Sequence, residues 1–381
     1  MIEVRHRLAD ITESIDCSGP DGTGQDFMFI DLASVDLGSK RIIAPRQLVI
    51  DSAPVRARQR LRRGDVLVST VRPRLNCVAS VPPELDGAIA TTSFSVLRPR
   101  PGILDERYLF RWVQGPEFIT DMTRLASGAS VPAVADALLR ASEIPLPPLA
   151  EQRRIASVLD EADQIRLDRR DAIALLDELA RSFYLSVVEG ATVFGTLRDL
   201  VESAAFGISV KTGAVRTGTN AVPIIRMSDI TGDGALNLTD LSVTELDAPE
   251  RERYSVKNGD VLFSRTASVE SVSKAEIFWG DLVSTHAANV IRLRPRHTAS
   301  ADYLAYFLNS AHTKDTLRAM ATINPTNLLL ASVPVPSFAA QALLAQELRD
   351  IHALKANERA QLALLDELYV TLENRAFTQR L

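Results

Sequence analysis

The pattern of apolar positions divides the chain into regions of two kinds. In residues 1–145 and 190–334, short apolar runs such as VLV and VLF are interrupted by Gly, Pro and Asp. This texture is typical of a mainly β fold with a few short helices. From residue 151 to about 188, and from 341 to about 377, apolar residues recur at steps of three and four without Gly or Pro. These two stretches predict long amphipathic helices.

Each predicted helix carries one apolar stripe. A helix of some 36 residues extends about 54 Å, longer than a compact domain needs for its own core. The stripes are therefore expected to pack against each other as an antiparallel coiled coil. Separate packing of each helix on its own domain is the alternative. The seam residues expected are Ile155, Leu159, Ala162, Ile173, Leu176, Leu179 and Phe183, with Leu344, Leu348, Ile351, Leu365, Leu368 and Leu372 in the second helix.

Five segments of the first half recur in the same order in the second half. The matches are 8–14 with 197–203, 63–69 with 258–264, 96–100 with 292–296, 144–147 with 333–336, and 175–179 with 364–368. Their offsets are 189, 195, 196, 189 and 189 residues, which a small insertion explains. A period near 190 residues suits a whole domain with a connecting element rather than a solenoid repeat. The chain is therefore predicted to be a tandem duplication with pseudo-twofold symmetry.

The duplication predicts an α+β fold of four parts. Two mixed-β domains with short helices are expected at 1–148 and 190–337, and two long helices at 149–189 and 338–381. The halves share their scaffold strands but differ in the loops that follow them. Two different recognition surfaces on one kind of frame are therefore expected.

Composition narrows the class of protein. The 381 residues are 46% hydrophobic and 24% charged, enough to bury substantial cores. Neither a membrane-spanning apolar run nor a secretory signal core is present, so a cytoplasmic protein is expected. Cys17 and Cys77 lie far apart without a CxxC pattern and predict reduced thiols. The formal net charge of -5 argues against a chain that wraps nucleic acid unaided.

Positive charge is nevertheless clustered in two runs of arginine. Either run alone is typical of a solvated face. A partner that supplies most of the positive surface would reconcile an acidic chain with DNA binding. The runs are Arg56, Arg58, Arg60, Arg62 and Arg63, and then Arg292, Arg294 and Arg296.

No catalytic pattern is found. The Asn324-Pro325 dipeptide does not continue into the Pro-aromatic sequence of a DNA methyltransferase, and Walker-type, HExxH and His/Cys patterns are missing. The five histidines are dispersed without a paired base or nucleophile. Asp65 and Asp260, in the repeated GDVL segments, could be nuclease acids, but a turn before a buried strand is the favoured explanation. We therefore predict no catalytic or metal-ligating residue.

Polar side chains suited to base contacts follow the repeated strands. Arg pairs with guanine, Asn or Gln with adenine, and Ser or Thr with either. For each candidate, a solvated loop or a turn is the alternative. The candidates are Arg72, Arg74, Asn76, Thr92 and Ser93 in the first half, and Lys211, Arg265, Thr266, Ser268, His286 and Asn289 in the second.

Several of these segments resemble a known family. LPPLAEQRRIASVLDEAD at 146–163 is similar to the joint of type I restriction-modification specificity subunits, where a recognition domain ends and the first long helix begins. The resemblance implies two target recognition domains separated by two long helices, each domain recognising half of a split, asymmetric DNA target. Similar family patterns are GDVLVSTVRP at 64–73, GDVLFSR at 259–265, FGISVKTG at 206–213, VPIIRMSDITGDG at 222–234 and NPTNL at 324–328.

The resemblance also implies partners. A non-catalytic subunit of this kind would bind double-stranded DNA and two methyltransferase subunits that carry S-adenosylmethionine. Whether restriction subunits also join is left open. Its long helices would set the spacer between half-sites, whose centres lie roughly 34 to 36 Å apart when they share one face of the duplex. The residues implied in docking are Glu151, Gln152, Arg153, Arg154 and Gln341.

The second joint departs from the family pattern. Only Gln341 is kept there, because Ala340, Ala342 and Leu343 replace the charged residues of the first joint. Equal docking of two partners is therefore left open. A coiled-coil interaction scaffold without DNA specificity, and an unrecognised enzyme, remain the alternatives.

Overall fold

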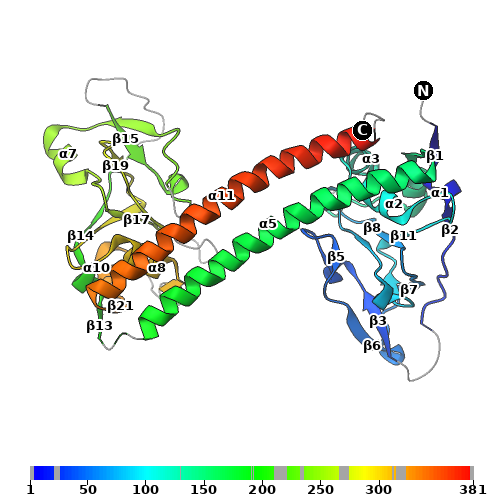
Figure 1. The fold of residues 1–381 in the computed structure, drawn as a ribbon, viewed down its shortest axis with the longest axis horizontal. Helices are drawn as coiled ribbons and strands as arrows, with labels where there is room; N and C mark the ends of the chain where they lie inside the picture. Colours follow the sequence, from blue (N-terminus) through cyan, green and yellow to red (C-terminus); the bar gives the residue numbers. More distant parts are fainter. Residues whose placement is uncertain are drawn as a thin grey trace. The chain divides into compact units, whose positions relative to one another are not determined.

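The computed structural model describes residues 4–20, 26–128, 130–189, 191, 193–209, 221–231, 236–265, 274–310, 313–314 and 323–377. The chain forms two compact units, the first from Met1–Arg170 with Gln361–Leu381 and the second from Asp171–Ala360. Each unit combines one mixed-β head with parts of both long helices (Figure 1). Among the described helices, none is long and apolar enough to cross a membrane.

Among the described residues, the first head contains two four-stranded sheets, two two-stranded sheets and short helices. One sheet has the order β2-β11-β8-β9, and a second has the order β6-β3-β10-β7 with β10 parallel to β3. The strands are β1 (Arg5–Arg7), β2 (Thr12–Glu13), β3 (Asp26–Ile30), β4 (Val35–Asp36), β5 (Arg41–Ile42), β6 (Arg46–Val49), β7 (Ala57–Arg60), β8 (Val66–Ser69), β9 (Val78–Ser80), β10 (Ile89–Thr91), β11 (Phe94–Pro99) and β12 (Glu143–Pro145). The helices are α1 (Leu8–Ile11), α2 (Glu106–Trp112), α3 (Pro116–Leu125) and α4 (Asp136–Arg140), with 3-10 turns η3 (Pro73–Leu75) and η4 (Pro83–Leu85).

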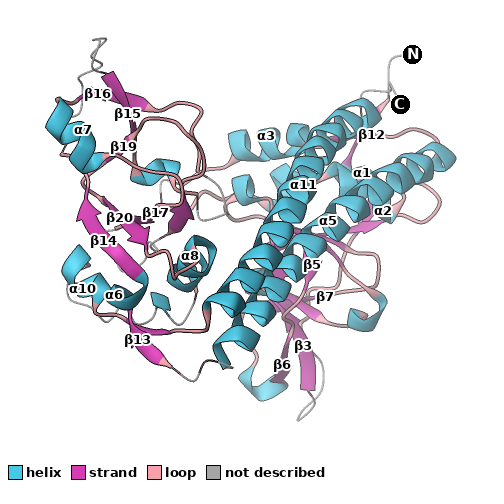
Figure 2. Cartoon of the chain, turned by 60° about the vertical axis from the view of Figure 1, so that its left-hand side comes forward, coloured by secondary structure: helices cyan, strands magenta, loops and turns pink. Residues whose placement is uncertain are grey.

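The second head repeats most of this topology. Figure 2 draws its strands in magenta and its helices in cyan. Its sheets have the orders β14-β20-β17-β18 and β16-β15-β19, with β19 parallel to β15. The strands are β13 (Phe194–Thr196), β14 (Val201–Phe206), β15 (Ala221–Ile225), β16 (Ser242–Glu245), β17 (Val261–Ser264), β18 (Ala275–Ile277), β19 (Thr285–His286), β20 (Val290–Pro295) and β21 (Ser332–Pro334). The helices are α6 (Leu197–Leu200), α7 (Ala248–Tyr254), α8 (Ala301–Asn309) and α10 (Pro325–Leu329).

The repeated VLVS and VLFS segments form the central strands β8 and β17. Side chains alternate between the faces of a strand, so Val66 and Val68 pack in one core of the first head and Leu67 in another. Burial on both faces explains why these segments are continuously apolar rather than alternating. The same division recurs in β17, where Leu262 faces a different core from its neighbours.

The aspartate before each central strand forms a buried ion pair. Asp65 accepts hydrogen bonds from the Arg98 guanidinium at 2.7 and 2.8 Å, and Asp260 accepts the same pair of bonds from Arg294. Each carboxylate also accepts a backbone N–H of its own turn. These contacts give both aspartates a structural role and agree with the turn explanation rather than with nuclease acids.

The long helices α5 (Leu149–Glu189) and α11 (Phe338–Phe377) pair antiparallel within each unit. In the first unit, Arg166 donates to Asp366 at 2.6 Å. In the second unit, Lys355 pairs with Asp177. The repeat relates the two ion pairs. The basic residues Arg166 and Lys355 are 189 positions apart, and so are the acidic residues Asp177 and Asp366. The predicted fold class is confirmed.

Two of the expected seam residues are misplaced. Leu179 and Leu368 are 44% and 51% exposed. The residues that follow them in sequence, Ala180 and Tyr369, are buried instead. The apolar pattern is ambiguous here because both helices carry more leucines than one face can bury.

Candidate nucleic-acid interface

The loop after β8 presents two arginines to solvent. Arg72 and Arg74 are exposed and form no ion pair with any described residue. Arg72 has a φ of 50°, a left-handed conformation that costs an L residue roughly 1 to 2 kcal/mol. Its N–H donates to the Pro132 carbonyl at 2.7 Å, and the Val134 N–H donates to Thr70 at 2.8 Å. Backbone hydrogen bonds to Pro132 and Val134 thus hold the loop in place, while its two guanidinium groups remain exposed to a ligand.

Asn76 ends the same loop but has an internal role. Its side-chain amide donates to the Val113 carbonyl at 2.8 Å, and its backbone has a φ of 46°. The amide that would contact adenine therefore anchors the loop to the end of α2. We remove Asn76 from the proposed base-contacting set.

A second loop of the first head lies beside the first. Thr70 donates to the Ser93 carbonyl through both its backbone N–H and its hydroxyl, each at 2.9 Å. Thr92 is exposed and Ser93 is half-buried. Because β8 and β11 are antiparallel neighbours, both loops meet at one end of the sheet. The structure thus brings together Arg72, Arg74, Thr92 and Ser93.

The second head makes the equivalent contact, from the Arg265 N–H to the Asn289 carbonyl at 2.9 Å. The Arg265 guanidinium lies 5.3 Å from the ring centroid of Phe206, a half-exposed residue that sequence reasoning did not select. The next residue must be glycine, because a Cβ at Gly207 would lie 1.9 Å from the His286 carbonyl oxygen. Lys211, Thr266 and Ser268 lie outside the described residues.

His286 is a core residue. It is fully buried in β19, where it pairs with Ile225 of β15. Burial and the nearby Arg292 lower the pKa of His286 to about 4, so its ring is neutral at neutral pH. A side chain enclosed in this way cannot reach a base edge without unfolding the strand. His286 is therefore also removed from the base-contacting set.

In the second arginine run, Arg296 is exposed, but Arg292 and Arg294 are not on a solvated face. Arg292 is buried and donates to the Ser255 carbonyl at 2.6 Å, and Arg294 forms the ion pair with Asp260. Alternation along β20 turns both side chains toward the same face of the sheet. Neither guanidinium is available to DNA phosphates.

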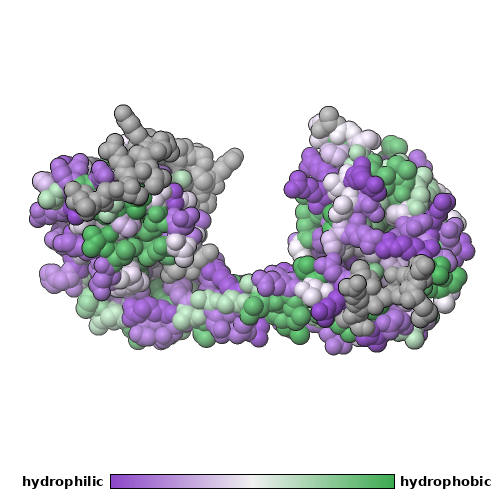
Figure 3. Space-filling model, turned by 90° about the horizontal axis from the view of Figure 1, so that it is seen from above, coloured by the Kyte–Doolittle hydropathy of each residue, from purple (hydrophilic) through white to green (hydrophobic). Residues whose placement is uncertain are grey.

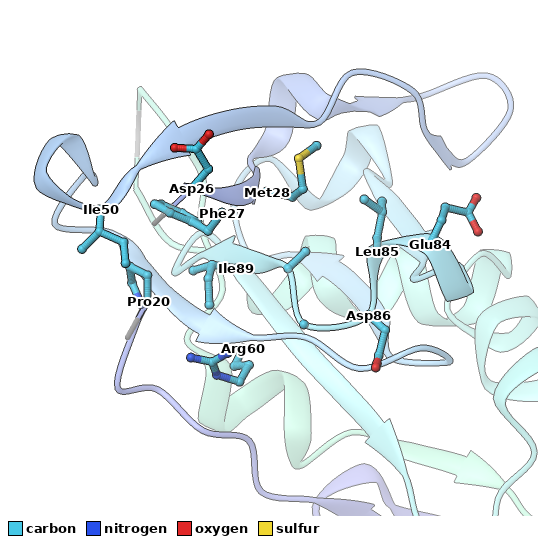
Figure 4. Close-up of a pocket in the computed structure, with 12 residues that line it drawn as sticks. Pro20, Asp26, Phe27, Met28, Ile50, Arg60, Glu84, Leu85, Asp86 and Ile89 are labelled. Atoms are coloured by element: carbon cyan, nitrogen blue, oxygen red, sulfur yellow. The ribbon is translucent and has the colours of Figure 1, made fainter. Parts of the chain in front are cut away.

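A hollow of about 270 Å³ in the first head has the wrong charge for a phosphate site. Figure 4 shows the side chains that line it, among them the carboxylates of Asp26, Glu84 and Asp86 and one guanidinium, that of Arg60. Carboxylates repel a phosphate backbone. The loops after β8 and β10 are the better candidates for DNA contact.

The glutamines of both joints are buried and hold the helices to the heads. The Gln152 carbonyl oxygen accepts from the Asp105 N–H at 2.8 Å, and the Gln341 oxygen accepts from the Ser300 N–H at 3.0 Å. Their amide groups donate to Pro147 and Pro336 at 2.8 and 2.9 Å. Neither is free to dock a partner, which corrects the role implied for them.

The charged residues of the first joint remain accessible. Arg154 pairs with Glu151 at 2.7 Å, and the exposed Arg153 lies 3.5 Å from Asp105. The second joint has Ala340, Ala342 and Leu343 at these positions. The two joints therefore share an internal anchor and differ on their outer surface.

Comparisons with known proteins agree with this architecture. Residues 63–175 match the family model of the type I restriction modification DNA specificity domain. The chain is 24% identical over 289 residues to the StySPI type I specificity subunit of Salmonella potsdam, covering 68% of this chain and 60% of that protein. It is 24% identical over 247 residues to the EcoKI specificity subunit of Escherichia coli K12, covering 58% and 51%. The matches span about half the length of the curated relatives.

Solved structures show the same fold over the whole chain. A structure described as the basis of complex assembly and conformational transition of the type I restriction-modification system covers 99% of this chain and 98% of its own, at 24% identity and a TM-score of 0.60. The S subunit of a type I system from M. genitalium covers 98% and 96%, at 12% identity and a TM-score of 0.58. The predicted resemblance is thus confirmed: residues 63–175 match the type I restriction modification DNA specificity domain, and the chain has the fold of type I specificity subunits.

Proposed function

We propose that the chain is the non-catalytic, sequence-specific DNA-binding subunit of a type I restriction-modification complex. Each head recognises one half of an asymmetric, bipartite target in double-stranded DNA. The two long helices set the spacer and dock two methyltransferase subunits, which carry S-adenosylmethionine.

The observation that carries the proposal is the repeated pair of loops at one end of each head's central sheet. The loops are joined by the same backbone hydrogen bond in both heads, from Thr70 to Ser93 and from Arg265 to Asn289. Their side chains differ, with the exposed Arg72 and Arg74 in the first head and the half-buried Arg265 beside the exposed Phe206 in the second. Two heads with the same backbone arrangement but different side chains on these loops are suited to bind two different half-sites.

The helices supply continuous spacers. At 1.5 Å per residue, the 41 residues of α5 extend about 60 Å. Half-sites on one face of the duplex have centres roughly 34 to 36 Å apart. A helix of this length is sufficient to bridge them.

Removing one or two turns from both helices should shorten the unread spacer and leave the half-sites unchanged. Footprinting that shows the original spacer would refute this role.

An exposed apolar flank on the helix pair supports docking of two copies of one partner. In the first unit Ile165, Leu364 and Leu368 are exposed, and in the second Leu354, Leu175 and Leu179 hold the equivalent positions. Arg166 of α5 contacts Tyr369 of α11 across the helix pair. Ile165 and Leu368 are the residues just before these two, and in an antiparallel pair the preceding residues of both helices lie on the same side. Figure 3 shows hydrophobic patches among hydrophilic side chains along the helices.

The DNA-binding role is tested by replacing Arg72 and Arg74 with Ala. Duplexes bound by the complex with its methyltransferase subunits are selected from a random library and sequenced. We expect loss of preference at one half-site, by roughly 5- to 150-fold for a lost bidentate contact, and an unchanged second half-site. Arg62→Ala with Arg63→Ala, before β8 rather than after it, removes the same charge and should leave both preferences intact.

Two outcomes would contradict the proposal. If the selected duplexes show no sequence preference although the methyltransferase subunits bind, the chain is an interaction scaffold. If the purified chain alone transfers methyl groups or cuts DNA, it is an enzyme.

A further inference from the structure

Equivalent ion pairs in the two units have opposite polarity. In the first unit, Arg107 of α2 pairs with Asp160 of α5. In the second unit, Asp302 of α8 accepts a hydrogen bond from Arg349 of α11 at 2.7 Å. The head is therefore the cationic partner in one unit and the anionic partner in the other.

The equivalence of these positions follows from contacts that the units share. Asp105 and Ser300 cap the starts of α2 and α8, and each donates its N–H to the buried glutamine of its own joint. The residues Tyr108 and Tyr303 donate to the Pro145 and Pro334 carbonyls at 2.9 and 2.6 Å. The residues on either side of Arg107 and Asp302 make the same contacts in the two units. Arg107 and Asp302 therefore hold equivalent positions, and the reversal of charge is a real difference between the units.

A second layer of the same contact also differs between the units. In the first unit, the buried Arg111 donates to Asp160 at 2.7 Å and to Asp163 at 2.9 Å, and it also contacts the Tyr369 hydroxyl at 3.2 Å. Burial raises the pKa of the buried Glu373, and the charge of Arg111 partly offsets this rise.

Aromatic groups replace these charges in the second unit. Tyr306 holds the position equivalent to Arg111, and Tyr184 holds that of Glu373, 189 residues earlier in the chain. Their ring centroids are 5.0 Å apart. His352 stands where the first unit has Asp163.

We propose that this reversed polarity determines which head each long helix accepts, so that the two heads are not interchangeable. The seat of a head is the part of the following long helix that packs on α2 or α8. If the first head took the second seat, Arg107 would face Arg349. If the second head took the first seat, Asp302 would face Asp160. Both exchanged arrangements place like charges together.

Burial strengthens this discrimination at the Asp302 carboxylate, whereas the side chains of Arg107 and Arg349 are 50% and 46% exposed. Asp302 is 9% exposed, and burial raises the pKa of its carboxyl group, which shows that the charge depends on its partner. A partly buried charge that loses its partner or meets a like charge is much less screened by solvent than an exposed pair. Exchange would also leave Glu373 facing Tyr306 in place of Arg111. The duplicated chain thereby carries an internal signal for the order of its two recognition heads.

The test is a full chain in which residues 190–337 are replaced by a second copy of residues 1–148. In this hybrid the copied Arg107 faces Arg349, so Arg349→Asp should raise the thermal midpoint of the affected unit, by about 3 °C or more. In the natural chain the same substitution places a second carboxylate beside Asp302 and should lower the midpoint by a similar amount. Arg349→Gln should give a smaller shift of the same sign in each background.

The proposal depends on that reversal of sign. A shift in the same direction in both backgrounds would overturn it, because Arg349 would then act independently of the head above it. A hybrid that stays unfolded both with and without the Arg349→Asp substitution would overturn it too, because charge would not decide which head the seat accepts.

Discussion

The side-chain oxygen of Gln152 accepts a hydrogen bond from the backbone N–H of Asp105, at 2.8 Å. This N–H belongs to the residue that caps α2, so the contact ties the start of the long helix to the first helix of the head that precedes it. Gln341 makes the equivalent bond to Ser300 in the second unit. The glutamine kept at both joints is thus an internal anchor.

Gln152→Ala should loosen this anchor. A buried donor left without an acceptor costs about 1 to 3 kcal/mol. We expect a lower thermal midpoint and loss of hydrogen-exchange protection at the Asp105 amide. Gln341→Ala is the matched control and should expose the Ser300 amide while leaving Asp105 protected. Unchanged protection of Asp105 in the first variant would contradict the assigned role.

Asp65→Ala should destabilise the first unit strongly. It leaves the Arg98 guanidinium buried without its carboxylate, which typically costs about 3 to 5 kcal/mol. Chemical denaturation should show the loss, and the double variant Asp65→Leu with Arg98→Met should recover much of it, because removing both charges leaves neither unpaired. A stable Asp65→Ala protein with altered DNA chemistry would instead support a catalytic aspartate.

Glu373 should make the first unit less stable as the pH rises. Burial, only partly offset by Arg111 and Arg166, raises the pKa of Glu373 from 4.5 to about 7. Between these values the folded state holds a proton that the unfolded state has lost, so the unfolding free energy falls as pH rises. Glu373→Gln should remove this slope and stabilise the protein above pH 7 by at most about 3 kcal/mol. Parallel stability curves for the two proteins between pH 5 and 8 would rule out a buried, titrating Glu373.

His286 should act in the opposite direction on the second unit. Burial and Arg292 lower the pKa of His286 from 6.5 to about 4, so the unfolded state takes up a proton first as pH falls. The stability that depends on the neutral ring is fully present above pH 6.5 and is lost as pH falls toward 4. Unfolding measured at pH 7 and pH 5 should show a smaller difference in His286→Gln than in the natural chain. Altered DNA preference with unchanged stability would show that His286 contacts a base instead.

Much of the architecture could be predicted from residues close together in sequence. The steps of three and four that indicate α5 and α11, the VLVS and VLFS strands, and the five repeated segments are all local patterns. The exposure of Arg72 and Arg74 also agrees with their place in a loop after a strand. Such patterns indicate an element and its repetition directly, because periodicity is a property of the chain itself.

The roles of polar residues could not be predicted in this way. Asn76 bonds to Val113, 37 residues away, and Gln152 bonds to Asp105, 47 residues away. His286 lies 3.4 Å from the Ala205 carbonyl, 81 residues earlier. As sequence positions these side chains look as available to DNA or to a partner as Arg72 does. Only their distant partners show that they are engaged.

The sequence alone determined the duplication, the fold class and the resemblance to type I specificity subunits, because apolar periodicity and recurring motifs persist along the chain. Tertiary structure decided which polar groups are buried, which leucines leave the seam, and which charge of each head meets its helix. These properties depend on which surfaces meet. A hydrogen bond or an ion pair needs two partners within about 3 Å, and no pattern within one segment specifies the second partner.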